Sequence, residues 1–220
     1  MHTDLPSHAF VEQSPRPRRL TKRGADMRAR ILGATIACIV RSGFAAMTVE
    51  SVIAEAGISR GSMLHQFPTR LDLVVATADR AMHVVLQQAR DRAGAIEDPF
   101  RRLADYAQIV WDTQSLPEGL ALTEILQAAG WDRELAAAIR PIAAIVEQEV
   151  RDEMVGLATA AGIADIETMV ARGWLLVSSA RGLIIEHRLN EERPMILAAI
   201  EEMKASHRRF CEAVNKNSHV

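Results

Sequence analysis

Aromatic side chains are scarce in this chain of 220 residues, which has three tryptophans, five phenylalanines and a single tyrosine. Apolar residues nevertheless make up 49% of the sequence, mainly as Ala, Leu, Ile, Val and Met. Strands favour aromatic and β-branched residues, whereas this composition as a whole favours helices. Its hydrophobicity also excludes a disordered chain. We therefore expect an all-α fold with a substantial core.

Cysteine is equally rare. Cys38 and Cys211 belong to no CxxC pair, so neither a disulfide framework nor a cysteine-based metal site is expected. No apolar run reaches the roughly 18 residues that indicate a membrane span, and residues 1–20 lack the apolar core of a signal peptide. These absences predict a soluble protein of the reducing cytoplasm.

The motifs of common enzyme classes are missing as well. The sequence has no nucleophile elbow, phosphate-binding glycine loop or HExxH pattern. His187 and Glu191, like His207 and Cys211, have the spacing of half a metal site, but such pairs are more often surface or interface neighbours. We expect no enzyme activity, no cofactor and no bound metal.

Charge is divided unevenly along the chain, although the net charge is only −2. Residues 1–70 hold ten Lys/Arg and five Asp/Glu, whereas residues 71–220 hold sixteen and twenty-three. A basic N-terminal part and an acidic remainder predict a polyanionic partner for the N-terminal part alone.

Apolar spacing predicts helices along most of the chain after a flexible basic arm, residues 1–22. A first helix runs from Asp26 to before Gly43, and Thr48, Ser59 and Thr69 are N-caps of the next three. Later helices are expected to start at Pro99, Pro117 and Asp132, with a kink or a restart at Pro141. The last two helices are expected over residues 165–189 and 194–215.

The segment from Thr48 to Leu73 predicts a helix, a glycine-containing turn and a second short helix, which is a helix-turn-helix. In this motif the second helix enters the DNA major groove while the first contacts the backbone. Arg60 can pair with guanine and Gln66 with adenine, and the Thr48 hydroxyl can bind a phosphate. The candidate DNA-binding residues here are Thr48, Ser59, Arg60, Gly61, Ser62, Leu64, His65 and Gln66.

The stretch from Thr48 to Pro68, TVESVIAEAGISRGSMLHQFP, closely resembles the signature of the TetR family of transcriptional regulators. Arg30-Ile31-Leu32 and Gly43-Phe44 also fit the family's first helix, so the resemblance covers about residues 26–75. It implies about nine helices, of which three bind DNA and a fourth links them to a helical ligand-binding and dimerisation domain. It further implies that the last two helices form a four-helix bundle with those of a second subunit.

Three positions depart from the family pattern. Leu64 stands where a phosphate-binding tyrosine is usual, Gln66 where histidine is common and Arg70 where lysine is common. Arg70 is still expected to reach a phosphate from the start of the fourth helix. Arg18 and Arg19 of the basic arm are expected to reach an adjacent minor groove and to offset the loss at Leu64.

The resemblance also places a pocket in the larger domain, where apolar walls and a few polar groups are typical of ligand sites. The pocket candidates are Tyr106, Trp111, Gln127, Trp131, Met154, Met169, Trp174 and Arg181, although most such residues are ordinary core. The last helix has an apolar seam at alternating four- and three-residue steps, typical of coiled-coil-like packing. The dimer-interface candidates are Trp174, Val177, Leu183, Ile196, Ile200, Met203, His207 and Phe210.

These observations predict a basic arm (1–22), a DNA-binding domain (23–70) and a ligand-binding and dimerisation domain (71–220). The expected function is a homodimeric, nucleoid-associated regulator that binds a palindromic double-stranded DNA operator. It is expected to act as a repressor that a small-molecule effector releases. An activator, or a ligand-independent regulator that acts through protein contacts, is the alternative.

Overall fold

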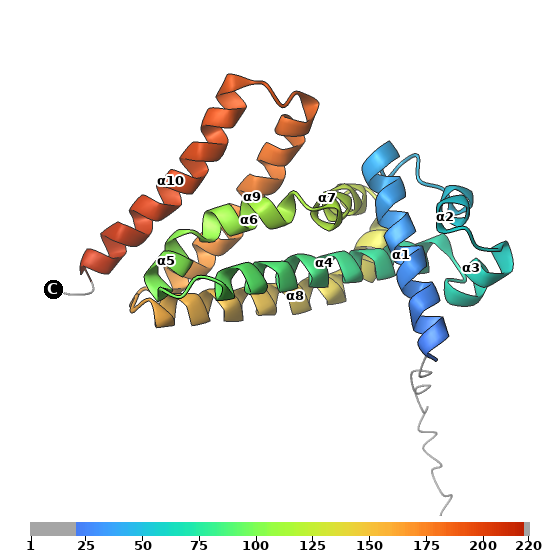
Figure 1. The fold of residues 1–220 in the computed structure, drawn as a ribbon, viewed down its shortest axis with the longest axis horizontal. Helices are drawn as coiled ribbons and strands as arrows, with labels where there is room; N and C mark the ends of the chain where they lie inside the picture. The colour runs from blue at the N-terminus through green and yellow to red at the C-terminus, as the bar shows by residue number, and fades with distance from the viewer. Residues whose placement is uncertain (1–20, 218–220) are drawn as a thin grey trace, which may run out of the picture.

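The computed structural model describes residues 21–217, and within them it contains ten α-helices and no strand (Figure 1). The all-α prediction is therefore confirmed. None of these helices combines the length and apolar character that crossing a bilayer requires. The helices are α1 (Lys22–Ser42), α2 (Val49–Ala56), α3 (Arg60–Gln66), α4 (Arg70–Gly94), α5 (Pro99–Ala104), α6 (Tyr106–Gln114), α7 (Pro117–Ala129), α8 (Arg133–Ala160), α9 (Ile166–Leu189) and α10 (Pro194–Asn217).

Hydroxyl side chains cap α2, α3 and α4, as the sequence predicts. Thr48 Oγ1 accepts a hydrogen bond from the Ser51 N–H, and Ser51 Oγ accepts one from the Thr48 N–H, both at 3.1 Å. Ser59 and Thr69 each accept a backbone N–H from the first turn of the helix that follows. These bonds satisfy N–H groups that have no partner within their helix, so they set where the helices begin.

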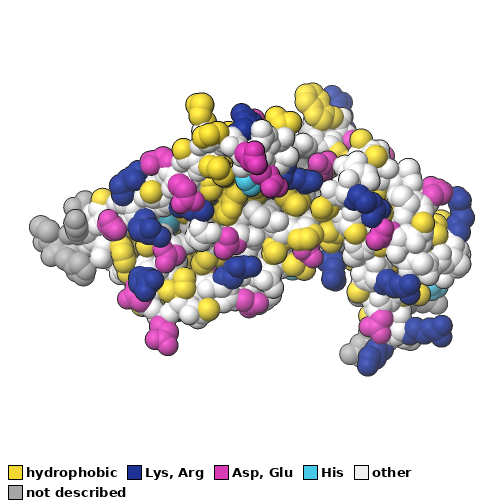
Figure 2. Space-filling model, turned by 45° about the horizontal axis from the view of Figure 1, so that its top comes forward, with side chains coloured by type: hydrophobic (Ala, Val, Ile, Leu, Met, Phe, Trp, Pro, Cys, Tyr) yellow, Lys and Arg dark blue, Asp and Glu magenta, His cyan; other side chains and the backbone are white. Residues whose placement is uncertain are grey.

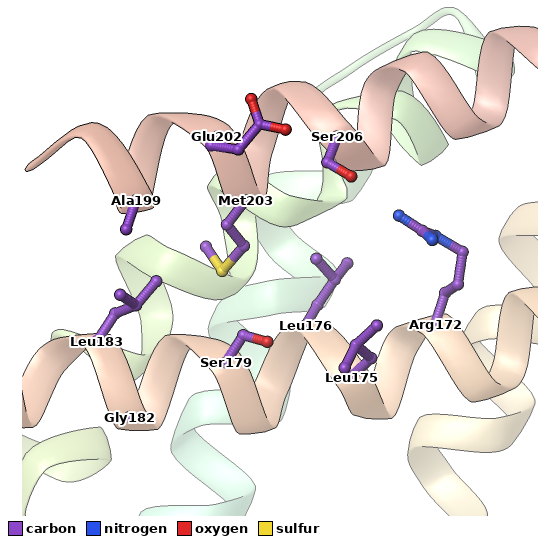
Figure 3. Close-up of a pocket in the computed structure, with 10 residues that line it drawn as sticks. All are labelled: Arg172, Leu175, Leu176, Ser179, Gly182, Leu183, Ala199, Glu202, Met203 and Ser206. Atoms are coloured by element: carbon purple, nitrogen blue, oxygen red, sulfur yellow. The ribbon is translucent and has the colours of Figure 1, made fainter. Parts of the chain in front are cut away.

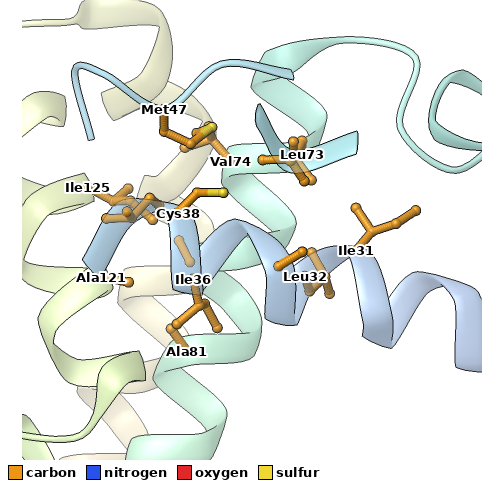
Figure 4. Packing of buried hydrophobic residues seen from close by; sticks show 14 of the residues in the cluster. Ile31, Leu32, Ile36, Cys38, Met47, Leu73, Val74, Ala81, Ala121 and Ile125 are labelled. Atoms are coloured by element: carbon orange, nitrogen blue, oxygen red, sulfur yellow. The ribbon is translucent and has the colours of Figure 1, made fainter. Parts of the chain in front are cut away.

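Helix α1 lies at the centre of a first hydrophobic cluster (Figure 4). Ile31 and Ile36 of α1 are buried in this cluster together with Leu73 of α4 and Ile125 of α7. The core of the first three helices is therefore continuous with α4 and α7, and it crosses the domain boundary expected at residue 70. The predicted division of the chain remains a prediction.

The long helix α4 contributes to a second cluster as well. Leu73 and Val74 near its start belong to the first cluster, whereas Ala89 and Ala93 near its end pack with α5, α6 and α8–α10. In Figure 1, α4 runs from the α1–α3 end of the molecule toward α5, with α8 beside it. One continuous helix thus joins the two parts of the structure.

Two details differ from the expected helices. The single helix expected from Pro99 is divided into α5 and α6 at Asp105, whose carboxylate pairs with Arg208 of α10 at 2.6 Å. Helix α8 continues through Pro141 from Arg133 to Ala160, so the helix does not restart there. Proline disfavours a helix interior because it removes one backbone hydrogen bond, but tertiary packing can outweigh this local cost.

His207 of α10 is fully buried within its own chain, not at a dimer interface as the sequence analysis expects. Its Nε2 donates to the Leu103 carbonyl oxygen at 2.9 Å, and its Nδ1 has no partner among the described residues. Burial lowers the pKa of His207 to about 4, and the nearby charges of Arg172 and Arg208 act in the same direction. The imidazole is therefore held neutral.

We expect the free energy of unfolding to fall as the pH drops from about 6.5 to about 4, by up to about 3 kcal/mol from His207. In that range the unfolded state binds a proton that the folded state excludes. Urea unfolding at a series of pH values measures this. His207→Gln should lose this share of the pH dependence, whereas His65→Gln, at an exposed position, should keep it. An unchanged profile in His207→Gln would contradict the assignment.

Candidate nucleic-acid interface and internal cavity

The turn between α2 and α3 is fixed by one glycine and by buried side chains on both sides. Gly57 adopts a left-handed conformation, φ 59° and ψ 47°, that glycine tolerates best. Val52 of α2, Met63 of α3 and Phe67 are buried in the first hydrophobic cluster. The two short helices are therefore held against α1 as one helix-turn-helix unit.

The outer face of α3 carries side chains that can form hydrogen bonds. Arg60 and His65 are exposed, and Ser62 and Gln66 are half-buried. Leu64 is 48% exposed, which leaves an apolar side chain free to contact a thymine methyl group. Thr48 and Ser59, which cap α2 and α3, are exposed as well. This face has the chemistry of a base-reading surface.

Arg60 already has a partner in the unbound chain. Its Nη1 lies 3.3 Å from Glu50 Oε1 of α2, and the two side chains are 72% and 65% exposed. Ion pairs this exposed contribute about 0–1 kcal/mol at most. Arg60 can therefore leave Glu50 for a base or a phosphate at little cost.

Two arginines of α1 bind the backbone of the helix-turn-helix, a role that the sequence alone does not indicate. Arg28 donates to the Gln66 carbonyl oxygen at 3.4 Å and lies over the Phe67 ring at 4.3 Å. Arg30 donates to the Gly57 carbonyl oxygen at 3.5 Å. Both bonds satisfy backbone carbonyls at the end of a short helix, so Arg28 holds the end of α3 and Arg30 holds the turn after α2. The only sequence signal for them is the presence of basic residues in α1.

Arg70 is bound differently from the phosphate contact that the sequence analysis expects. Its Nη2 donates to the carbonyl oxygens of Phe44 and Met47, both at 3.4 Å, and its guanidinium lies over the Phe44 ring. It therefore fastens the start of α4 to the connection between α1 and α2. Its side chain remains exposed, so a phosphate contact stays a prediction.

The charge distribution separates this end of the molecule from the rest. In Figure 2, Lys and Arg side chains predominate over the end formed by α1–α3, with a few acidic side chains among them, whereas acidic side chains are more frequent along the remainder. Arg18 and Arg19 of the predicted arm lie outside the described residues. A positive surface around α3 attracts the phosphates of DNA at long range.

An internal cavity of about 40 Å³ lies among α4, α6, α7, α8 and α9. Tyr106, Trp174 and Arg181 of the predicted pocket line it, and the sequence analysis misses Gln114 beside them. Burial raises the pKa of the Tyr106 hydroxyl and lowers the pKa of the Arg181 guanidinium. Thr113 is the other polar residue of the wall. The remaining wall residues are apolar, and they are Met82, Val85, Leu86, Ala89, Val110, Leu122, Val146, Val150 and Val177.

The N-terminal region matches a known family model. Residues 31–77 match the family described as bacterial regulatory proteins, tetR family. Over 177 residues the chain is 25% identical to the HTH-type transcriptional regulator CymR of Pseudomonas putida, an alignment that covers 78% of this chain and 84% of CymR. The chain is a DNA-binding transcriptional regulator of the TetR family. Because the relatives are regulators, the prediction that the chain is not an enzyme is confirmed.

Solved structures of TetR-type regulators have the same fold. The multidrug binding protein EbrR, complexed with imidazole, is 25% identical with a TM-score of 0.57, covering 87% of this chain and 96% of EbrR. A transcriptional regulator from Rhodococcus sp. Rha1 is 18% identical with a TM-score of 0.65, and the match covers 86% of this chain and 96% of that regulator. A regulator from Saccharomonospora viridis, in complex with choline, is also 18% identical, with a TM-score of 0.62 and the same coverage.

Several pocket residues expected for this TetR-type chain lie elsewhere. Trp131 is 93% exposed between α7 and α8, so it lines no cavity. Trp111 packs edge-on against His187, and Gln127 lines a surface hollow between α7 and α9. Met154 and Met169 are fully buried in the second hydrophobic cluster, where they fill space between helices. Helical periodicity identifies inward faces but not which of them border a void.

Several dimer-interface candidates have neighbours within their own chain, and the interface stays a prediction. Val177 and Trp174 line the internal cavity, and Ile200 is buried within the chain, as is His207. Phe210 lies beneath the guanidinium of Arg172 in the same chain, with 4.1 Å between the guanidinium carbon and the ring centroid. Ile200 and His207 of the α10 seam are therefore covered by their own subunit, whereas Ile196 and Met203 are half-buried in the single chain. No cluster of three or more metal-binding side chains occurs among the described residues.

We expect Arg60→Ala to weaken binding to a cognate operator by about 1–3 kcal/mol and to relax specificity at one base pair. The reason is the loss of a side chain that can donate two hydrogen bonds to guanine. Fluorescence anisotropy against cognate and single-substituted operators measures both effects. Arg133→Ala, at an exposed position of α8, is the control. Equal losses on cognate and random DNA would make Arg60 a phosphate contact instead.

Proposed function

We propose that this regulator is a homodimeric repressor that binds a palindromic operator and is released by a small molecule, acting in the cytoplasm at the nucleoid. The observation that carries the proposal is the course of α4. Three residues separate this helix from the end of α3, and it supplies Met82, Val85, Leu86 and Ala89 to the wall of the internal cavity. A change at the cavity can therefore move the DNA-binding unit.

DNA contact is assigned to the exposed face of α3 and the helix starts beside it. Arg60, Ser62, His65 and Gln66 face the bases, Leu64 meets a thymine methyl group, and the Gly61 backbone allows close approach. Thr48, Ser59 and Arg70 bind phosphates around this surface. Arg18 and Arg19 extend the contact from the N-terminal arm.

Dimerisation is assigned to the outer face of α9 and α10. Figure 3 shows a groove between these helices, with Arg172, Ser179 and Leu183 of α9 facing Met203 and Ser206 of α10. The groove has a volume of about 530 Å³. Three large apolar side chains of α9 are exposed in the single chain: Leu175, which lines the groove, and Ile185 and Leu189, which border the hollow between α7 and α9. Exposed apolar groups that share one helix face indicate an interface.

Two copies related by a two-fold axis through this face present two α3 helices in opposite orientations. Each α3 enters one major groove, so the operator is an inverted repeat with half-sites about one helical turn apart, or a multiple of it. A ligand in the cavity favours a different position of α4 and misplaces the two α3 helices. The ligand shifts this equilibrium only by its difference in affinity for the two states. The complex of EbrR with imidazole supports small-molecule binding by this fold.

We expect operators selected from genomic DNA by binding to contain an inverted repeat. When one half-site is reversed to give a direct repeat of equal spacing, affinity should fall to near the level of a single half-site. The two-fold symmetry of the dimer forbids both α3 helices from fitting a direct repeat. Anisotropy titrations measure the loss, and scrambling the bases between the half-sites is the control. Equal affinity for both repeats would refute the palindromic mode.

We expect Leu175→Arg to convert the dimer into monomers and to weaken operator binding, because it places a charge in the apolar interface. Sedimentation velocity measures the oligomeric state. Trp131→Arg replaces a more exposed apolar side chain outside α9 and α10 and should leave the dimer intact. A Leu175→Arg protein that stays dimeric would place the interface elsewhere.

A further inference from the structure

Arg181 is a cation without a counter-ion in the wall of the internal cavity. The sole hydrogen bond of its side chain to any described residue runs from Nε to Gln114 Oε1, at 3.2 Å. Among the described residues, no carboxylate forms an ion pair with it. The cavity wall contains no Asp or Glu and no second Lys or Arg. Arginine stays protonated in proteins, so one positive charge faces a largely apolar space.

The groups around Arg181 are held in place. Gln114 is buried at the end of α6, and a Cβ atom at Gly119 would collide with the Gln114 backbone, so α7 lies directly against it. With Nε committed to Gln114, the two terminal nitrogens of the guanidinium remain for a further acceptor. Arginine binds a carboxylate with two parallel hydrogen bonds, and such charge-assisted bonds are strong in surroundings of low polarity.

We propose that the effector of this regulator is an apolar monocarboxylate whose carboxylate pairs with Arg181. This proposal rests on the ligand-released function proposed above. A single cation matches one negative charge, whereas a phosphate dianion would need a second basic group that the wall lacks. The body of the ligand packs on Val85, Leu86 and Val150 and against the Trp174 ring. Tyr106 and Gln114 supply further hydrogen-bonding groups.

The size of the cavity connects this binding to release from DNA. About 40 Å³ holds little more than a few water molecules, whereas a cavity that binds benzene has about 150 Å³. An apolar acid can therefore enter only if the wall moves outward. Because α4 forms one side of the wall, through Met82, Val85, Leu86 and Ala89, entry displaces the helix that carries α3.

The test uses the full-length dimer with octanoate, phenylacetate and 2-naphthoate, each beside its uncharged primary amide. Isothermal titration calorimetry measures binding, and anisotropy with a selected operator measures release. We expect each acid that binds to bind more tightly than its amide. Arg181→Met should weaken acid binding by about ten- to a hundredfold, and Arg181→Lys should retain part of it. Arg133→Met, which removes an exposed arginine of α8, should leave acid binding unchanged.

The outcomes separate the ligand class from the proposed function. The ligand class is overturned if no acid of the panel binds more tightly than its amide. It is also overturned if Arg181→Met, with a native circular dichroism spectrum, binds the acids as tightly as the wild-type protein. If Arg181→Met does not fold, Arg181→Lys decides: a reduced preference for the acid over its amide supports the site, and an unchanged preference refutes it. Acid binding that depends on Arg181 but leaves operator affinity unchanged supports the site and refutes ligand release. Release by an amide, independent of Arg181, supports release and refutes the ligand class.

Discussion

The continuity of α4 is the constraint on which the rest of the structure depends. Its start is buried in the core around α1, and its end is buried in the core around α5, α6 and α8–α10. A helix of 25 residues fastened at both ends transmits a displacement along its axis instead of absorbing it in a loop. The cavity borders the middle of this helix, so one continuous helix both lines the cavity and connects to α3.

A second connection joins the DNA-binding unit to the helices around the cavity. Glu124 of α7 accepts the Phe44 N–H at 3.2 Å, and Arg188 of α9 donates to the Val40 carbonyl oxygen at 3.2 Å. Both bonds satisfy backbone groups where α1 ends, which would otherwise lack partners. The α1–α3 unit is therefore held from α4, α7 and α9, and three of the helices that line the cavity also position the DNA-binding surface.

Electrostatic roles in this protein depend on which partner each arginine meets. Arg60 forms a weak surface pair that it can exchange, whereas Arg28, Arg30 and Arg70 bind backbone carbonyls of their own unit. Among the described residues, the Arg181 side chain binds neither a carboxylate nor a backbone carbonyl, and the Gln114 amide is its one partner. All five are one residue type in similar helical surroundings, so their different roles follow from spatial neighbours and not from local sequence.

The sequence alone determined the all-α fold, the helix-turn-helix and most helix boundaries, because capping residues, prolines and apolar periodicity act over a few residues. It also identified the family, since the segment from Thr48 to Pro68 must satisfy the turn, the core and the exposed face together. Only the tertiary structure decided that His207 is internal, that Trp131 is exposed and that Gln114 faces Arg181. Each of these facts depends on contacts between helices distant in sequence, and periodicity shows which side of a helix is apolar without showing what covers it.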